Sequence, residues 1–321
     1  MAPQHATSLT DLGLTVAGGQ GIMITGLAID SRAVKPGFLF AALSGSQVHG
    51  GEFIQYALRM GAAAVLTDAQ GAKIAAKELA ASDAVLVLSE DPRAAIARAA
   101  ALWYGPTPET MVAVTGTNGK TSVACFARQL WQVLGRPAVN LGTTGVEGDF
   151  QLPLRHTTPD PLTLHQALAA AAKAGISHVA MEASSHGLDQ RRLDGVVLAA
   201  AGFTNLSQDH LDYHHTMEEY LAAKAGLFSR ILPEEGVAVI NIDDAAGPGL
   251  AGAAAKRGQE VITIGHGPEA RLRLLAQRFD ATGQDLRFDW QGRAHMTRLD
   301  LIGGFQASNA AMAACLLIAA G

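Results

Sequence analysis

The 321-residue sequence is poor in aromatic residues, in charged residues and in cysteine. Aromatic side chains make up 5% of it and charged side chains 17%, while hydrophobic side chains make up 49%. This composition excludes an intrinsically disordered chain, and Ala, Val, Leu and Ile must fill the core. The 24 Lys and Arg against 29 Asp and Glu argue against a nucleic-acid-binding protein, which would carry a basic surface. The length suggests two or three domains.

The two cysteines, Cys125 and Cys315, lie far apart in apolar helical patterns and lack metal-binding spacing. This predicts buried free thiols in a reducing compartment. The N-terminal residues lack the apolar core of a signal peptide, and the longest apolar run, residues 310–321, is too short to span a membrane. We therefore expect a cytoplasmic monomer with no membrane or nucleic-acid partner.

Strand and helix patterns alternate along the chain, which is typical of an α/β protein. Gly and Pro residues at 105–108 interrupt the alternation and predict a linker. Residues 1–105 are thus expected to form a small N-terminal α/β domain and residues 109–321 a second domain. The first domain should contain strands at 38–42, 63–66 and 84–88, and helices at 53–59, 72–80 and 92–103.

The second domain shows repeated strand–helix–strand units, which predict a mostly parallel sheet covered by helices on both faces. A helix over 161–174 is marked by Asp160 as its N-cap, by Pro161 in its first turn and by Gly175 at its end. Further helices are expected at 123–134 and 310–320. The expected strands are 111–114, 138–141, 178–181, 197–203, 237–241 and 261–264.

Residues 115–122, Thr-Gly-Thr-Asn-Gly-Lys-Thr-Ser, stand between an apolar strand and a helix. Small residues allow a tight loop whose amides face one point, and the helix N-terminus adds positive charge there. Lys120 could reach the β- and γ-phosphates, and the Thr121 hydroxyl could ligate Mg²⁺. Val114 occupies the position of the first glycine of the full motif, so the loop is a shortened variant. The alternative is a glycine-rich turn with a surface lysine.

Two further polar segments follow apolar strands, where ligands bind in open α/β sheets. Glu182 ends one strand and is placed to ligate Mg²⁺, although it could instead cap the next turn. His210 lies in a segment rich in His and Asp and could ligate a metal directly or through water, or could be a surface residue.

Lys224 stands in an apolar helical pattern, where burial would disfavour its charged form and favour the neutral amine. From the residues alone, a lysine that extends its ammonium group to solvent is the favoured interpretation.

Together these segments resemble the Mur ligase family of peptidoglycan synthesis, and within it the ligases that add the third peptide residue. The resemblance begins near residue 27 and runs to the end of the chain. It is carried by residues 30–32, 36–37, 115–121, 156–159, 182–192, 203–214 and 222–224. It implies a small UDP-binding domain followed by a P-loop-type central domain. It also implies an ATP-dependent amide ligase that joins a diamino acid, meso-diaminopimelate or L-lysine, to UDP-MurNAc-L-Ala-D-Glu through an acyl phosphate.

The resemblance also implies roles for individual residues. Lys120, Lys224 and His210 would be catalytic, with Lys224 carrying a carbamate derived from CO₂. Mg²⁺ would be held by Thr121, Glu182, His210 and the carbamate on Lys224. ATP would be bound by Gly116, Thr117, Asn118, Gly119, Lys120, Thr121, Ser122 and Asn309. The UDP-sugar-peptide would be bound by Ser31, Ser46, Gln47, Val48, Thr157, Thr158, Ser184, Gln190 and Arg192.

Two features depart from the family pattern. Gln306 replaces a common asparagine, and nothing corresponds to the family's C-terminal ligase domain, which recognises the added amino acid. We therefore expect a two-domain portion that is inactive alone. A silent module that binds UDP-sugar or ATP, and another ligase of the superfamily such as a folylpolyglutamate synthetase, are the alternatives.

Overall fold

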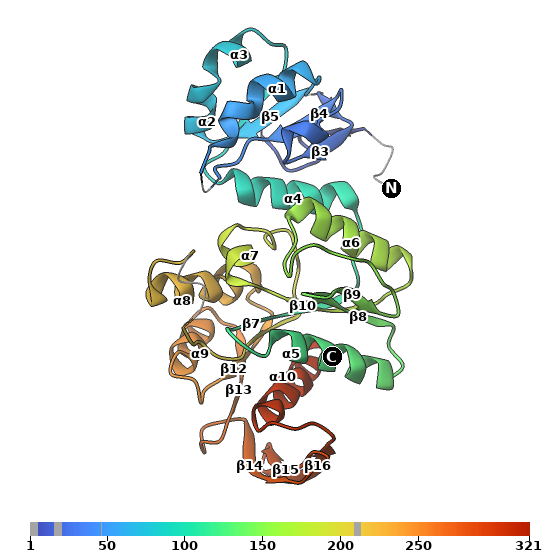
Figure 1. Cartoon of the computed structure of the whole chain (residues 1–321), viewed down its shortest axis with the longest axis vertical. Helices are drawn as coiled ribbons and strands as arrows, with labels where there is room; N and C mark the ends of the chain where they lie inside the picture. Colours follow the sequence, from blue (N-terminus) through green and yellow to red (C-terminus); the bar gives the residue numbers. More distant parts are fainter. Residues whose placement is uncertain (1–5, 16–20, 46, 209–212) are drawn as a thin grey trace. The chain divides into compact units, whose positions relative to one another are not determined.

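The computed structural model describes residues 6–15, 21–45, 47–208 and 213–321. It divides into two compact units, whose elements are labelled in Figure 1. The first unit contains Met1–Thr107 together with Asp160–Ala169 and Arg191–Val196. The second unit contains Pro108–Pro159, Ala170–Gln190 and Val197–Gly321. Two segments from the middle of the chain thus belong to the first unit, which sequence patterns alone did not indicate.

The first unit is built on a four-stranded parallel sheet in the order β3-β4-β5-β6. These strands are Gly26–Ala28, Phe38–Ala41, Ala64–Thr67 and Val85–Leu88, which confirms the three predicted ones. Its helices are α1 (Ile54–Arg59), α2 (Ala69–Ile74), α3 (Ala76–Ala80) and α4 (Pro92–Tyr104). The single helix predicted over 72–80 was wrong, because Ala75, with φ −104° and ψ 25°, leaves the helical conformation and separates α2 from α3. A short antiparallel pair, β1 (Thr7–Ser8) and β2 (Met23–Ile24), completes the unit.

The second unit contains a ten-stranded sheet in the order β16-β15-β14-β13-β12-β11-β7-β10-β8-β9. The run from β14 to β8 is parallel, and antiparallel strands form both edges. The predicted central strands are confirmed as β7 (Thr110–Thr115), β8 (Ala138–Gly142), β10 (His178–Glu182), β11 (Ala200–Phe203), β12 (Val237–Asn241) and β13 (Glu260–Gly265). The edge strands were missed: β9 (Gly145–Gly148), β14 (Leu272–Phe279), β15 (Gln284–Trp290) and β16 (Arg293–Leu299).

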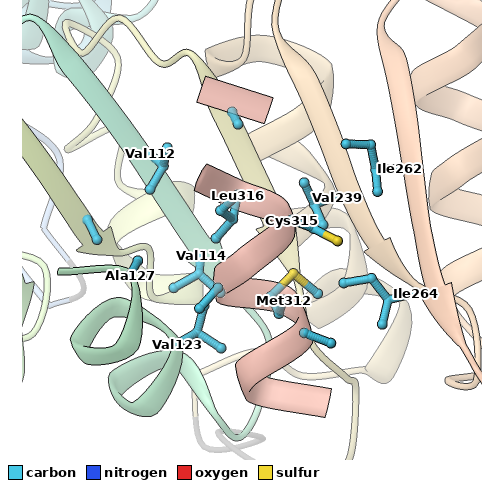
Figure 2. Packing of buried hydrophobic residues seen from close by; sticks show 14 of the residues in the cluster. Val112, Val114, Val123, Ala127, Val239, Ile262, Ile264, Met312, Cys315 and Leu316 are labelled. Atoms are coloured by element: carbon cyan, nitrogen blue, oxygen red, sulfur yellow. The ribbon is translucent and has the colours of Figure 1, made fainter. Parts of the chain in front are cut away.

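The helices that lie wholly in the second unit are α5 (Lys120–Val133), α7 (Ser185–Asp189), α8 (Met217–Gly226), α9 (Gly247–Lys256) and α10 (Phe305–Ala320). Helix α6 (Pro161–Lys173) begins within the first unit and ends in the second. Helices α5 and α10 pack against each other and against the sheet. Figure 2 shows Met312, Cys315 and Leu316 of α10 among the aliphatic side chains of the strands. Aliphatic residues therefore fill this core, as the composition predicted.

The cysteine prediction is half confirmed. Cys315 is fully buried, and burial raises the pKa of its thiol to about 12, whereas Cys125 is only partly buried; both are free.

No helix in the described part of the chain is long and apolar enough to cross a membrane.

Helix α6 begins as the sequence predicted. The Asp160 carboxylate accepts hydrogen bonds from the amides of Leu162 (3.0 Å) and Thr163 (3.1 Å), and Gly175 follows the helix with φ +84°. The helix also buries His165 completely, and neither ring nitrogen has a hydrogen-bond partner. This burial lowers the pKa of His165 from 6.5 to about 4.

We predict that His165 makes folding stability depend on pH between about 4 and 6.5. Because the folded state binds the proton less tightly than the unfolded state, stability should fall as the pH drops through this window, by up to about 1.4 kcal/mol per pH unit. Urea unfolding of the parent and of His165→Leu should show that the variant loses this slope. Exposed His295→Gln controls for removing a histidine, and equal slopes in parent and His165→Leu would refute the prediction.

Candidate active site

The order of the strands creates the site of the second unit. The central strand β7 lies between β10 and β11, so the chain passes to one side of β7 and later to the other. At such a switch point the loops after neighbouring parallel strands diverge and leave a crevice at their carboxyl ends. Three parts of the chain lie at this edge: the loop after β7, Glu182 at the end of β10, and Thr204 with Asn205 after β11.

The loop after β7 passes into α5 earlier than the sequence predicted. The helix begins at Lys120 rather than Val123, so Lys120, Thr121 and Ser122 belong to its first turn. The first amides of a helix have no partner within it and carry partial positive charge. The cradle for an anion is therefore the start of α5.

The amides of Thr117 and Asn118 donate hydrogen bonds to Asn205, to which the sequence analysis assigned no role. The Thr117 amide donates to the Asn205 carbonyl (2.8 Å), and the Asn118 amide donates to Asn205 Oδ1 (3.0 Å). Asn205 Nδ2 and the Thr204 hydroxyl both donate to the Asn118 carbonyl, at 3.1 and 2.7 Å. These bonds fix the loop in advance of any ligand.

The turn into α5 requires a residue without a side chain. Gly119 has φ +90°, and a Cβ atom there would lie 2.5 Å from Oδ1 of Asn309. Asn309, predicted to contact adenine, is thus placed on α10 directly beside the loop. It is 6% exposed, and its Nδ2 donates to Oε1 of Gln306 at 3.0 Å.

Two lysine side chains converge on one carbonyl of this loop. Lys120 Nζ donates to the Gly116 carbonyl at 2.9 Å and to the Thr117 carbonyl at 2.9 Å, and Lys224 Nζ donates to the same Gly116 oxygen at 2.8 Å. Lys224 is 1% exposed, and its amine lies 4.2 Å from the ring centroid of Tyr220. The prediction from residues alone, that Lys224 reaches solvent, was therefore wrong.

The Glu182 carboxylate is 2% exposed and is held by hydrogen bonds from two other elements. Its Oε2 accepts from the Thr121 hydroxyl (3.0 Å) and its Oε1 from the amide of Thr143 (2.9 Å). This arrangement fits Mg²⁺. Neighbouring ligands of an octahedral Mg²⁺ at 2.0–2.1 Å stand about 2.9 Å apart, which is close to the Thr121–Glu182 oxygen separation.

The predicted metal-site residues are only partly brought together in the structure. Lys224 lines the same pocket as Thr121 and Glu182, whereas His210 lies outside the described residues. No group of three or more His, Cys, Asp or Glu side chains gathers at a possible metal site within the described ranges. Among the described residues, Thr121 and Glu182 are therefore the side chains that could hold one Mg²⁺.

A pocket of about 250 Å³ joins these groups to two of the predicted substrate-binding residues, Thr157 and Ser184. Thr158 is buried and does not line the pocket; its hydroxyl donates to the Glu182 carbonyl (2.9 Å) and accepts from the Ser184 amide (3.0 Å). Gln190 is not part of the pocket lining; its Nε2 donates to the Tyr213 hydroxyl at 3.2 Å.

The first unit has its own pocket, of about 730 Å³. Ser31 and Val48, two of the residues predicted to bind the UDP-sugar-peptide, line it beside Phe53 and Tyr56, which are 47% and 46% exposed. Gln47 is exposed next to Val48, Ser46 lies outside the described residues, and Arg192 belongs to the first unit. Exposed aromatic rings, which the sequence analysis did not single out, give this pocket a surface on which a planar base could stack.

We predict that Gly142→Ala disturbs the Glu182 carboxylate, because a Cβ atom there would lie 1.9 Å from Glu182 Oε1. Overpacking of this kind costs about 1–3 kcal/mol of unfolding free energy, which urea unfolding can measure. Gly252→Ala in α9 is the matched control, because its Cβ would meet nothing within 4 Å. If the two variants were equally stable, Glu182 would not be held as tightly as described.

Two family models and several curated proteins match this chain. The model of the Mur ligase middle domain matches residues 114–317, and the model described as the Mur ligase family catalytic domain matches residues 23–104. A UDP-N-acetylmuramoyl-L-alanyl-D-glutamate–2,6-diaminopimelate ligase of Caulobacter vibrioides is 48% identical over 306 residues, which are 93% of this chain and 61% of that protein. The ligase of the same name from Brucella melitensis is 48% identical over 305 residues, covering 94% and 60%.

Solved structures show the same fold. One 2,6-diaminopimelate ligase of that name superposes with a TM-score of 0.82 at 30% identity, over 98% of this chain and 63% of that chain. The folylpolyglutamate synthase of Mycobacterium tuberculosis superposes with a TM-score of 0.54 at 21% identity, over 65% and 54%, a likeness of fold alone. The chain spans about 60% of the length of the curated relatives it matches. Since the middle-domain model alone matches more than half of its residues, the chain belongs to the Mur ligase family.

Proposed function

We propose that this chain provides the nucleotide and acyl-substrate sites of an ATP-dependent ligase that joins 2,6-diaminopimelate to UDP-MurNAc-L-Ala-D-Glu. The observation that carries this proposal is that one pocket of the second unit is lined by Lys120, Thr121, Glu182 and Lys224 together with Thr157 and Ser184. A cation-binding carboxylate, a phosphate-binding lysine and hydroxyl donors for a second substrate are what transfer of a phosphoryl group to a carboxylate needs. The choice of diaminopimelate follows the names of the relatives.

The nucleotide phosphates would bind at the start of α5. Lys120 would exchange the carbonyls of Gly116 and Thr117 for phosphate oxygens, and Asn309 would face the adenine. Thr121 and Glu182 would hold Mg²⁺, which neutralises charge on the β- and γ-phosphates when bound. The fixed loop would reduce the entropy cost of ordering it on binding, because Asn205 already holds the amides of Thr117 and Asn118.

The second substrate would present its D-glutamate carboxylate to the γ-phosphate. Attack of that carboxylate would form an acyl phosphate and release ADP, and the amine of diaminopimelate would then displace phosphate to give the amide. In this scheme Thr157, Thr158, Ser184, Gln190 and Arg192 would position the sugar-peptide. The first-unit pocket lined by Ser31 and Val48, together with the neighbouring Gln47, would bind the uridine.

We predict that calorimetry on this chain detects Mg·ADP and UDP-MurNAc-L-Ala-D-Glu as separate ligands. Lys120→Ala should weaken Mg·ADP binding about 10- to 100-fold, because one or two charge-assisted hydrogen bonds are lost. The affinity for the sugar-peptide alone should remain that of the parent. Lys173→Ala, an exposed lysine at the end of α6, is the control.

Unchanged Mg·ADP affinity in Lys120→Ala would contradict the nucleotide site. If the parent binds both ligands but a complete ligase system containing it shows no ATP turnover, the silent binding module is the better description. Binding of a folate in place of the sugar-peptide would favour the folylpolyglutamate synthetase alternative.

We also propose that Lys224 carries a carbamate. CO₂ reacts only with a neutral amine, and both the burial of Lys224 and the neighbouring Lys120 favour the neutral form. The Tyr220 ring acts in the opposite direction, because its π-face stabilises a cation. The carbamate would add an anionic oxygen ligand on the side of the pocket facing Thr121 and Glu182.

Carbon-13 NMR with labelled bicarbonate tests this proposal. We expect a carbamate signal in the Mg²⁺-loaded protein at neutral to alkaline pH, and its absence in Lys224→Gln. A signal that survives in Lys224→Gln would assign the carbamate to another amine, and a parent without any signal would leave Lys224 as an unmodified lysine.

A further inference from the structure

Thr143 connects the metal side of the pocket with the substrate side. It follows β8, lies exposed in the pocket and was not among the residues that the sequence pointed to. Its amide donates to Glu182 Oε1 at 2.9 Å, and its hydroxyl lies 3.1 Å from the Thr157 hydroxyl and 3.5 Å from Glu182 Oε2. One hydroxyl thus stands between a carboxylate proposed to bind Mg²⁺ and a threonine proposed to bind the sugar-peptide.

A hydroxyl group carries only one proton, so Thr143 can donate to one of these two neighbours at a time. While Glu182 Oε2 carries no cation, the carboxylate is the stronger acceptor and competes for that proton. In this state the Thr157 hydroxyl can donate its own proton to Thr143 Oγ1, and that proton is not available to a ligand.

A cation on Glu182 changes this competition. It withdraws electron density from Oε2 and weakens that acceptor for Thr143, whose proton then goes to Thr157 Oγ1. The Thr157 proton must in turn point away from Thr143, into the pocket. No covalent bond forms or breaks; each hydroxyl keeps its own proton and only rotates.

We propose that Thr143 is a positioning residue that couples the two halves of the site: cation binding at Glu182 turns the Thr157 hydroxyl into a donor for the sugar-peptide. This inference rests on the proposed function, since it takes Mg·nucleotide and UDP-MurNAc-L-Ala-D-Glu as the ligands. It predicts that each ligand strengthens the binding of the other by the same factor.

The test is a thermodynamic cycle measured by calorimetry on this chain. The affinity for UDP-MurNAc-L-Ala-D-Glu is measured with and without saturating Mg·ADP, and the ratio is the coupling factor. Thr143→Val keeps the amide that holds Glu182 and removes only the hydroxyl. We expect a coupling factor of about 5 or more in the parent, near the lower end of common values, and close to 1 in Thr143→Val.

Three further variants make the result specific. Thr143→Ser restores a hydroxyl and should restore the coupling. Thr144→Val, the adjacent exposed threonine outside this pocket, should leave it unchanged. Thr157→Val should remove it, and the double variant with Thr143→Val should lose nothing more, because both act through one hydrogen bond. In Thr144→Val the Mg·ADP affinity measured without the sugar-peptide should also stay within about twofold of the parent.

Each outcome decides the proposal. Coupling that persists in Thr143→Val, or that Thr143→Ser fails to restore, overturns it. A parent that binds both ligands without coupling overturns it too, while leaving the proposed function standing. A parent that binds neither ligand overturns the proposed function itself and this inference with it. Urea unfolding of every variant separates a lost hydroxyl from a lost fold.

Discussion

The burial of the Glu182 carboxylate is the constraint on which the site depends. A buried charge is tolerated only where hydrogen bonds replace its water, and here they come from the Thr121 hydroxyl on α5 and the Thr143 amide after β8. Three elements that are distant in sequence are thereby fixed around one group, at the edge where β10 ends. All of these donors are neutral, so a cation bound beside Glu182 would add the charged partner that the proposed function requires.

In the phosphate loop, the fold determines which backbone amides can bind a ligand. Asn205, after β11, takes the amides of Thr117 and Asn118, and so removes the first part of the loop from anion binding. The start of α5 supplies the first-turn amides, which have no partner within the helix itself, and Gly119 lets the backbone turn into it beside Asn309. The binding surface is therefore set by strand pairing, since β11 lies next to β7.

The sequence predicted those parts of the fold whose signals are local. Buried apolar runs marked the central strands, and the run of small residues ending in Lys120 and Thr121 located the phosphate loop. Strand β16 was missed because nearly all of its side chains are exposed, so it carries no apolar pattern. The roles of Thr143 and Asn205 could not be predicted either, because each depends on which strands are neighbours, and a threonine or asparagine in a loop carries no signal of that. The boundaries of the two predicted domains and the roles of the predicted site residues stay predictions, and Ser46 and His210 lie outside the described residues.

The contacts of Lys224 constrain the carbamate that we propose on it. In the structure the Gly116 carbonyl and the face of the Tyr220 ring surround its amine, and both stabilise positive charge. A carbamate is an anion, which both of these neighbours would repel, so a carbamylated side chain would have to leave them and turn toward Thr121 and Glu182. That movement would leave the Gly116 carbonyl to Lys120, which shares it here. Nucleotide binding at the proposed site would draw Lys120 away from the same carbonyl, toward the phosphates. In this proposal the modification and the nucleotide would act on a single backbone oxygen, and the state of each lysine would affect the other through it.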